Sequence, residues 1–201
     1  MTGLENIPLG KPIVELSQSV EKTLIFRNTK KKDLDDVLQI HREAFGQDEE
    51  ANLVNDLLHD DSARPLFSLL GTDKGKAVGH VLFTRVRVCG NGGTLSSVIL
   101  APLAVLPGEQ GCGVGGQLIL EGIKQLAESK VDLVFVLGHP KYYPRFGFEP
   151  AGALGFEAPY LIPAEHAAAW MVKELRPGVL ENFSGKIVCA DGLNRPELWR
   201  E

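Results

Sequence analysis

The chain has 201 residues, of which 44% are hydrophobic and 23% charged, and its formal net charge is −5. This length and apolar fraction suit one domain with a substantial core, and no run approaches the roughly 18 consecutive apolar residues of a membrane span. The acidic balance disfavours a nucleic-acid partner, because binding to phosphate backbones usually requires a basic face.

Residues 1–22 mix charged residues and prolines with apolar ones, and they lack the cationic start and continuous apolar core of a secretory signal. We therefore expect an N-terminal extension ahead of the domain and a cytoplasmic protein. Cys89, Cys112 and Cys189 are odd in number and far apart. This spacing indicates neither a disulfide framework nor a metal site.

In the first half of the chain, apolar residues recur with the periods of both strands and helices. The expected elements are a strand over 23–28, helices over 33–45 and 49–59, and strands over 66–71 and 77–88. Residues 73–76, Asp-Lys-Gly-Lys, predict a hairpin turn between the last two strands. His41 lies on the apolar face of the first helix, so we expect a packed core histidine.

The second half continues with a strand over 95–105 that Pro102 interrupts, which predicts a bulge or an unpaired side. The expected elements after it are a helix over 115–129, a strand over 131–137, a short helix over 142–146, a long loop over 152–166, and strands over 170–175 and 185–188. The helix over 115–129 is amphipathic, since its apolar residues recur at i, i+3 and i+4.

Residues 110–116, Gln-Gly-Cys-Gly-Val-Gly-Gly, lie between an apolar strand and this helix. Glycines let backbone N–H groups converge, and the helix N-terminus adds partial positive charge, so the pattern predicts a phosphate site. A dinucleotide site requires an acid at the end of the next strand, but the only acid of that strand, Asp132, stands at its start. A nucleotide P-loop requires lysine after the last glycine, where Gln117 stands. A glycine-rich turn without a ligand is the remaining alternative.

Two motifs resemble those of a known family. Residues 110–115 fit Gln-x-x-Gly-x-Gly, the pyrophosphate signature of the GNAT superfamily of acyl-CoA N-acyltransferases, and residues 143–148 fit its second signature, Tyr-x-x-x-Gly-Phe. About thirty residues separate the two motifs, as one helix and one strand require. Residues 103–107 and 136–140 resemble the bacterial YhbS-like branch. The resemblance covers roughly residues 23–175, and we expect residues 176–201 to pack on the same domain.

The resemblance implies an α/β fold with a mixed, mostly antiparallel, twisted sheet flanked by helices. Its central strands splay apart, and the acyl-CoA arm enters the gap. The implied reaction is direct transfer of an acetyl group from acetyl-CoA to a primary amine of a small molecule or protein in a ternary complex. A catalytically silent acyl-CoA sensor is the alternative. Neither a nucleic acid nor a membrane is expected as a partner, and the oligomeric state is open, a homodimer being one arrangement.

The resemblance also implies which residues hold the cosubstrate. They are Gln110, Gly111, Cys112, Gly113, Val114, Gly115 and Gly116 of the loop, Leu103, Ala104 and Val105 of the preceding strand, and Tyr143 and Phe146 of the short helix. Backbone groups of Leu103 and Val105 would pair with the pantetheine amides like an added strand, and one N–H of that strand would polarise the thioester carbonyl. Cys112 fills a variable position.

Tyr143 stands four residues before Gly147, where the family has its catalytic tyrosine. A tyrosine hydroxyl, with an ordinary pKa of about 10, can reprotonate a thiolate whose thiol has one near 8.5. An aromatic here can also pack the short helix onto the core, for which Tyr142 is the better candidate. The base that deprotonates the amine is left open.

Three sources of that base are compatible with the sequence. His139 ends a strand at the expected gap, and an imidazole suits proton abstraction near neutrality, although YhbS-like relatives usually carry aspartate there. Asp48, Glu49 and Glu50 lie at the junction of the first two helices, where acceptors often enter. Ordered water without a dedicated base is the third.

Overall fold

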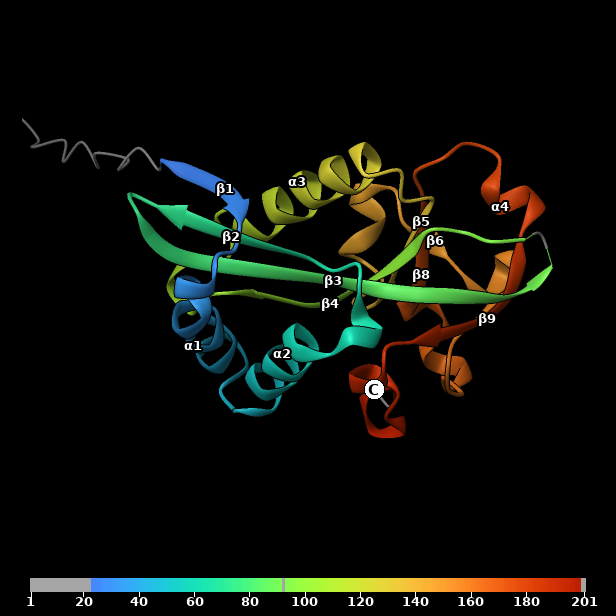
Figure 1. Ribbon diagram of the computed structural model, residues 1–201, viewed down its shortest axis with the longest axis horizontal. Coiled ribbons are helices and arrows are strands. Elements are labelled where there is room, and N and C mark those ends of the chain that lie inside the picture. The colour runs from blue at the N-terminus through green and yellow to red at the C-terminus, as the bar shows by residue number, and fades with distance from the viewer. Residues whose placement is uncertain (1–22, 92, 200–201) are drawn as a thin grey trace, which may run out of the picture.

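The computed structural model describes residues 23–91 and 93–199, and one mixed sheet runs through them (Figure 1). Its strands are β1 (Leu24–Asn28), β2 (Phe67–Asp73), β3 (Lys76–Asn91), β4 (Ser97–Val105), β5 (Leu133–Leu137), β6 (Glu149–Pro150), β7 (Phe156–Glu157), β8 (Trp170–Glu174) and β9 (Ser184–Cys189). The order is β1-β2-β3-β4-β5-β8-β6, while β9 pairs with the second half of β3 and β7 pairs with β9. Only β4–β5 and β7–β9 are parallel, so the expected mixed, mostly antiparallel sheet is confirmed.

Helices cover both faces of this sheet. Figure 1 shows α1 (Leu34–Phe45) and α2 (Glu49–His59) on one face and α3 (Val114–Glu128) on the other, with the short α4 (Val179–Asn182) near one end. The strands between them are apolar on both sides, as burial on both faces requires. In β5, Leu133 and Phe135 join the core under α1 and α2, and Val134 and Val136 join the core under α3.

The hairpin between β2 and β3 forms at the expected residues. Asp73 pairs with Lys76, which leaves a two-residue turn, and both turn residues have positive φ, +48° at Lys74 and +82° at Gly75. This is the backbone of a type I′ turn, whose twist matches that of the flanking strands. The predicted turn is confirmed.

His41 is fully buried on α1, as expected of a core histidine. Its Nε2 lies 2.8 Å from Nδ1 of His80 on β3, and His80 Nε2 lies 2.8 Å from the Ser68 hydroxyl on β2. Burial lowers the pKa of His41 to about 4, because a low-dielectric surrounding disfavours the charged ring. The pair therefore fastens α1 to the sheet in its neutral form.

Pro102 marks a bulge in β4, as its position in the strand predicts. Val81 of β3 faces Leu103, whereas Phe83 faces Leu100, so two β4 residues oppose Leu82. On its other side β4 pairs with β5 only as far as Leu100. The two parallel strands then part, while β4 continues to Val105. The splayed central strands implied by the resemblance are present at this point.

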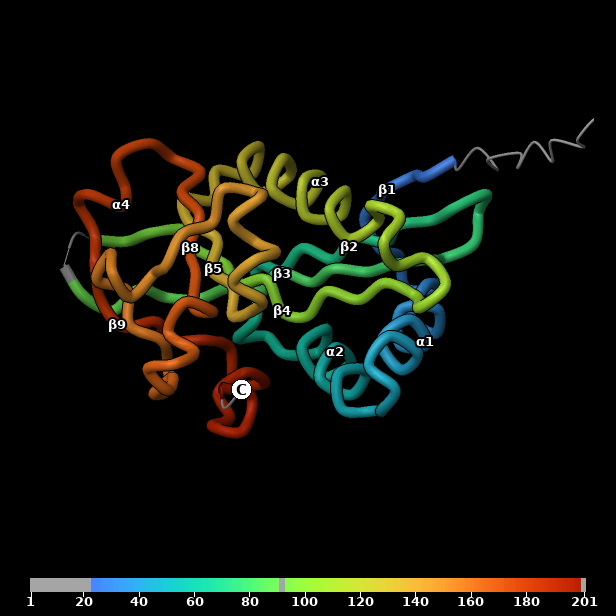
Figure 2. The backbone as a smooth tube through the Cα atoms, turned by 180° about the vertical axis from the view of Figure 1, so that it is seen from behind, coloured from blue at the N-terminus to red at the C-terminus, as the bar shows by residue number. Residues whose placement is uncertain are grey.

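The segments after β5 depart most from expectation. The predicted loop over 152–166 contains β7 and short 3₁₀ turns, and β6 and α4 were not predicted. Strands of two residues are too short to show a period. The C-terminal segment, residues 190–199, lies beside α2 (Figures 1 and 2), where the Asp191 N–H donates to the Ser62 hydroxyl at 2.9 Å. The expected domain boundaries at residues 23 and 175 stay a prediction.

Among residues 23–91 and 93–199, no helix has both the length and the apolar character to cross a membrane. The predicted N-terminal extension, residues 1–22, lies outside the described residues.

Candidate active site

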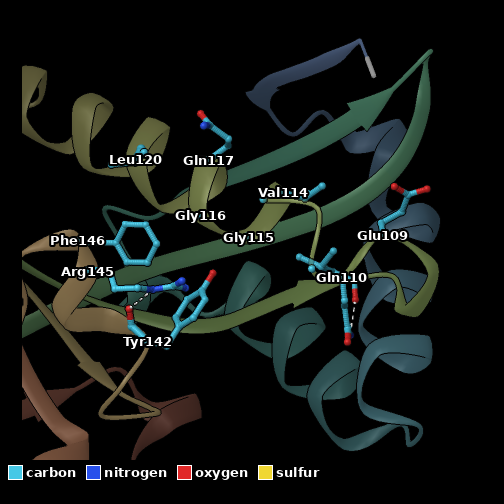
Figure 3. A pocket seen from close by; sticks show the side chains of 13 residues that line it. Glu109, Gln110, Val114, Gly115, Gly116, Gln117, Leu120, Tyr142, Arg145 and Phe146 are labelled. Carbon is cyan, nitrogen blue, oxygen red and sulfur yellow. Dashed lines mark hydrogen bonds between the residues drawn. The ribbon is translucent and has the colours of Figure 1, made fainter. Parts of the chain in front are cut away.

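A cavity of about 540 Å³ opens where the glycine loop leads into α3 (Figure 3). Its walls come from the end of β4, the loop, the first turns of α3 and the 3₁₀ turn at Tyr143–Phe146. Of the residues expected to hold the cosubstrate, those that line it are Val105, Gln110, Gly111, Gly113, Val114, Gly115, Gly116 and Phe146. Cys112 is exposed and does not line this cavity.

The N-terminus of α3 is open for an anion. The residue that precedes its first turn is Gly113, which has no side chain to cap the free amides. The first turns of α1 and α2 each carry two acids, but that of α3 carries none. Gly111 and Gly113 have φ of +72° and +86°, a conformation that glycine adopts without strain. Uncapped amides and an unneutralised helix dipole together fit a phosphate group.

The opposite wall of this cavity is aromatic and carries one cation. The Arg145 guanidinium lies 4.5 Å from the centre of the Tyr142 ring, and its Nε donates to the Tyr142 carbonyl at 3.2 Å. A Cβ on Gly115 would lie 2.8 Å from the Tyr142 hydroxyl oxygen, and one on Gly116 would lie 3.3 Å from the Phe146 ring. These two glycines therefore let the turn approach α3 closely (Figure 3).

The free edge of β4 runs from this cavity toward the bulge. The Leu106 N–H donates to the Val78 carbonyl of β3 at 3.0 Å. Because backbone groups alternate along a strand, those of Ala104 also face β3, and those of Leu103 and Val105 face the edge that β5 has left. The Gln110 side chain donates to the Val105 carbonyl at 3.0 Å. Leu103 and Val105 can thus offer backbone groups to an extended ligand, as expected of these two residues, and the backbone groups of Ala104 between them pair with β3.

A second cavity of about 510 Å³ lies where β4 and β5 part. Its inner wall comprises the β4 bulge, the end of β5 and the two neighbouring tyrosines, and its outer wall comprises the α1–α2 junction and the C-terminal segment. Tyr142 lines both cavities. A ligand bound at the α3 amides can therefore extend past Tyr142 along the edge of β4 into the second cavity.

The two tyrosines play different structural parts. Tyr143 is 8% exposed, packs edge-on against Phe148, and takes the space that a side chain at Gly138 would fill. Tyr142, of which packing was expected, does pack against the core under α3, but it stays half-buried because it also lines both cavities. Burial raises the pKa of Tyr142, while the Arg145 charge acts to lower it. The Tyr142 hydroxyl lies beside the first turn of α3. Tyr143 lines the second cavity and not the first.

His139 follows β5 and lines the second cavity, as its position predicts. Its Nδ1 accepts a hydrogen bond from the Lys141 N–H at 3.2 Å. A backbone N–H can only donate, so the neutral ring must carry its proton on Nε2. The lone pair that a general base needs is then occupied in this conformation.

The acids at the α1–α2 junction separate in the structure. Glu50 lines the second cavity, but Asp48 and Glu49 do not, and Asp48 pairs with Arg42 at 2.9 Å. Residues of the C-terminal segment line the same cavity, Glu197 and Trp199 among them, and sequence reasoning did not find them. It also missed Arg145, whose only signal was a cation placed between the two aromatics of the second motif.

Comparisons with known proteins identify the family to which the chain is similar. Residues 26–151 match the family model described as the acetyltransferase (GNAT) domain. The chain is 51% identical over 167 residues to the uncharacterized N-acetyltransferase YjhQ of Escherichia coli K12, a match that covers 83% of this chain and 92% of YjhQ. It is 34% identical to YhbS of the same strain over 77% of this chain and 89% of that protein.

Among the solved structures similar to this chain, two were determined with a CoA ligand. The structure of Escherichia coli YhbS in complex with CoA superposes with a TM-score of 0.77 at 32% identity, and the match covers 86% of this chain and 92% of that one. A Brucella melitensis acetyltransferase in complex with acetyl-CoA gives 0.67 at 25% identity, over 85% and 97% of the two chains.

Proposed function

Since the chain belongs to the GNAT acetyltransferase family, we propose that it transfers an acetyl group from acetyl-CoA to a primary amine by direct attack in a ternary complex. The observation that carries this proposal is the pair of cavities that share Tyr142, one at the uncapped α3 amides and the other where β4 and β5 part. The CoA and acetyl-CoA complexes of similar structures support the choice of cosubstrate.

The chain's own groups can perform each step of binding. The amides at the start of α3 hold the diphosphate, and Arg145 adds a positive charge on the facing wall. The pantetheine arm lies along the free edge of β4, where Leu103 and Val105 offer backbone groups as a neighbouring strand would. The Leu103 N–H is the donor that we assign to the thioester carbonyl, and a pre-aimed donor of this kind is worth roughly 3 kcal/mol.

In the chemical step, the neutral amine nitrogen forms a bond to the acetyl carbonyl carbon, and the bond from that carbon to sulfur breaks. The CoA thiolate leaves and takes the proton of the Tyr143 hydroxyl. The attacking nitrogen carries an extra proton once it has bonded to the acetyl carbon. This proton goes to water rather than to His139, because the hydrogen bond from Lys141 occupies the His139 lone pair. Glu50 lines the outer wall, away from the edge of β4 that leads to the thioester, and we assign it no part in this step.

A thiol-release assay with a panel of amines tests this proposal. We expect CoA thiol to appear in equal amount to acetylated amine. The alternative, a catalytically silent acyl-CoA sensor, predicts saturable acetyl-CoA binding with thiol release no faster than in the protein-free control. That outcome with every amine would refute the proposed function.

A further inference from the structure

The two walls of the second cavity differ in chemistry. The inner wall comprises the β4 bulge, Gly138 and Tyr143. The free edge of β4 runs into this wall. The outer wall consists of apolar side chains, among them Phe45, Leu53 and Trp199, and of two carboxylates. An acceptor must bridge these walls, because its amine has to reach the thioester at the inner one.

The carboxylates of the outer wall come from two distant parts of the chain. Glu50 belongs to the first turn of α2, and Glu197 belongs to the C-terminal segment. Within the described residues, no lysine or arginine lines this cavity. Two arginines on the same elements are engaged elsewhere, since Arg42 pairs with Asp48 at 2.9 Å and Arg195 pairs with Asp56 at 3.1 Å. The outer wall is therefore anionic without an internal counter-charge.

The C-terminal segment is anchored on both sides of Glu197. Trp199 is 2% exposed, donates from Nε1 to the Leu193 carbonyl at 3.0 Å, and packs edge-on against Trp170. The Gly192 N–H donates to the Asp60 carboxylate at 3.1 Å. These contacts fix the course of the backbone that places Glu197 at the cavity.

The chemistry of the transfer decides what such a wall can hold. The attacking amine must be neutral, but a neighbouring carboxylate stabilises the ammonium and so opposes attack. Carboxylates on the wall away from the thioester instead suit a cationic group that does not react. A cavity of about 510 Å³ falls within the range of small-molecule sites.

We propose, building on the acetyl transfer proposed above, that the acceptor is a small primary amine with a second cationic group. Glu50 and Glu197 hold the second group, and the apolar side chains of the outer wall contact the carbon chain between the two charges. The acceptor's reacting amine then lies at the inner wall beside Tyr143.

The test compares 1,4-diaminobutane with 1-aminobutane, which have the same carbon chain and differ by one ammonium group. We expect kcat/KM for the diamine to exceed that for the monoamine by about tenfold, as two partly exposed charge pairs allow. The diamine has two identical amino groups, so only a preference well above a doubling counts. The preference should fall as salt rises, because salt screens exposed charges.

Two variants with the same change of charge locate the effect. Glu197→Gln should lower the diamine-to-monoamine ratio by about fivefold. Glu181→Gln, at an exposed position of α4 away from the cavity, should leave the ratio at its wild-type value. Equal turnover of the two amines, or a ratio that Glu197→Gln and Glu50→Gln both leave unchanged, would overturn the proposal.

Calorimetric titration of each amine onto the protein saturated with CoA measures the affinity of the cationic site when no acetyl group can be transferred. Tighter binding of the diamine, lost in Glu197→Gln, supports the cationic site even where no thiol is released, and in that case the acetyl transfer is the part that fails. Equal binding of both amines, with thiol release intact, leaves the transfer standing and refutes the second charge.

Discussion

Replacing Gly113 with valine tests whether the N-terminus of α3 holds the CoA phosphates. Gly113 has a φ of +86°, and a Cβ placed there would meet nothing within 4 Å. The substitution therefore has two separable effects. It strains the backbone, and it adds a side chain to a residue that lines the first cavity.

The size of each effect can be worked out beforehand. A non-glycine residue in the left-handed region costs roughly 1–2 kcal/mol. A ligand at a hundred times its Kd stabilises the folded state by about 2.7 kcal/mol, which for a chain of this size raises the Tm by roughly 5–11 °C. A hundredfold loss of affinity would remove most of that rise.

Gly75→Val is the matched control. Gly75 has a φ of +82°, also meets nothing within 4 Å, and lies in the β2–β3 hairpin. Both variants should have a similarly lowered Tm without ligand. With saturating acetyl-CoA, Gly75→Val should recover the wild-type rise and Gly113→Val should not.

Thermal unfolding with and without acetyl-CoA, with NADH and ATP as comparison ligands, is the assay. We expect the wild-type rise with acetyl-CoA to exceed that with either comparison ligand. If Gly113→Val shows the same acetyl-CoA rise as Gly75→Val, the phosphates bind elsewhere and the role given to the loop is wrong.

Three further results are expected. Tyr143→Phe should lower kcat by roughly 10²-fold with acetyl-CoA affinity nearly kept, and equal behaviour of Tyr142→Phe in the same kinetics would refute the assignment of the acid. His139→Ala should leave the acidic limb of the kcat/KM profile in place, and loss of that limb would restore histidine as the base. Burial lowers the pKa of His41 to about 4, below the unfolded value of 6.5. The contribution of the neutral ring to the free energy of unfolding is therefore complete above pH 6.5 and is lost as the pH falls toward 4. Urea unfolding at pH 7 and 5 should show this loss, and a similar loss in His41→Gln would assign it to other groups.

Local chemistry explains what could be predicted from the sequence. The glycine loop was found because positive φ and an uncapped helix N-terminus require particular residues at adjacent positions, Gly111 and Gly113. The bulge was found because Pro102 has no N–H to give to a ladder. The hairpin at Lys74 and Gly75 was found because a two-residue turn with positive φ favours glycine.

The rest of the site depends on contacts between distant parts of the chain. Glu50 was a candidate from its place at the α1–α2 junction, but Glu197, which lines the same cavity, belongs to no motif and lies far along the chain from it. The state of His139 depends on a single hydrogen bond from Lys141 that residue types do not specify. The two-residue period of a strand was enough to choose Leu103 and Val105 over Ala104, but it says nothing about contacts between distant segments.

A single-turnover experiment tests the direct transfer of the acetyl group most closely. Protein in excess over acetyl-labelled acetyl-CoA is mixed with an active amine, and the label is followed in the amine, in free acetate and on the acid-precipitated protein. We expect the label to pass to the amine at the rate of thiol release, with none on the protein. Label that accumulates first on the protein, or that leaves as acetate, would contradict direct attack in a ternary complex.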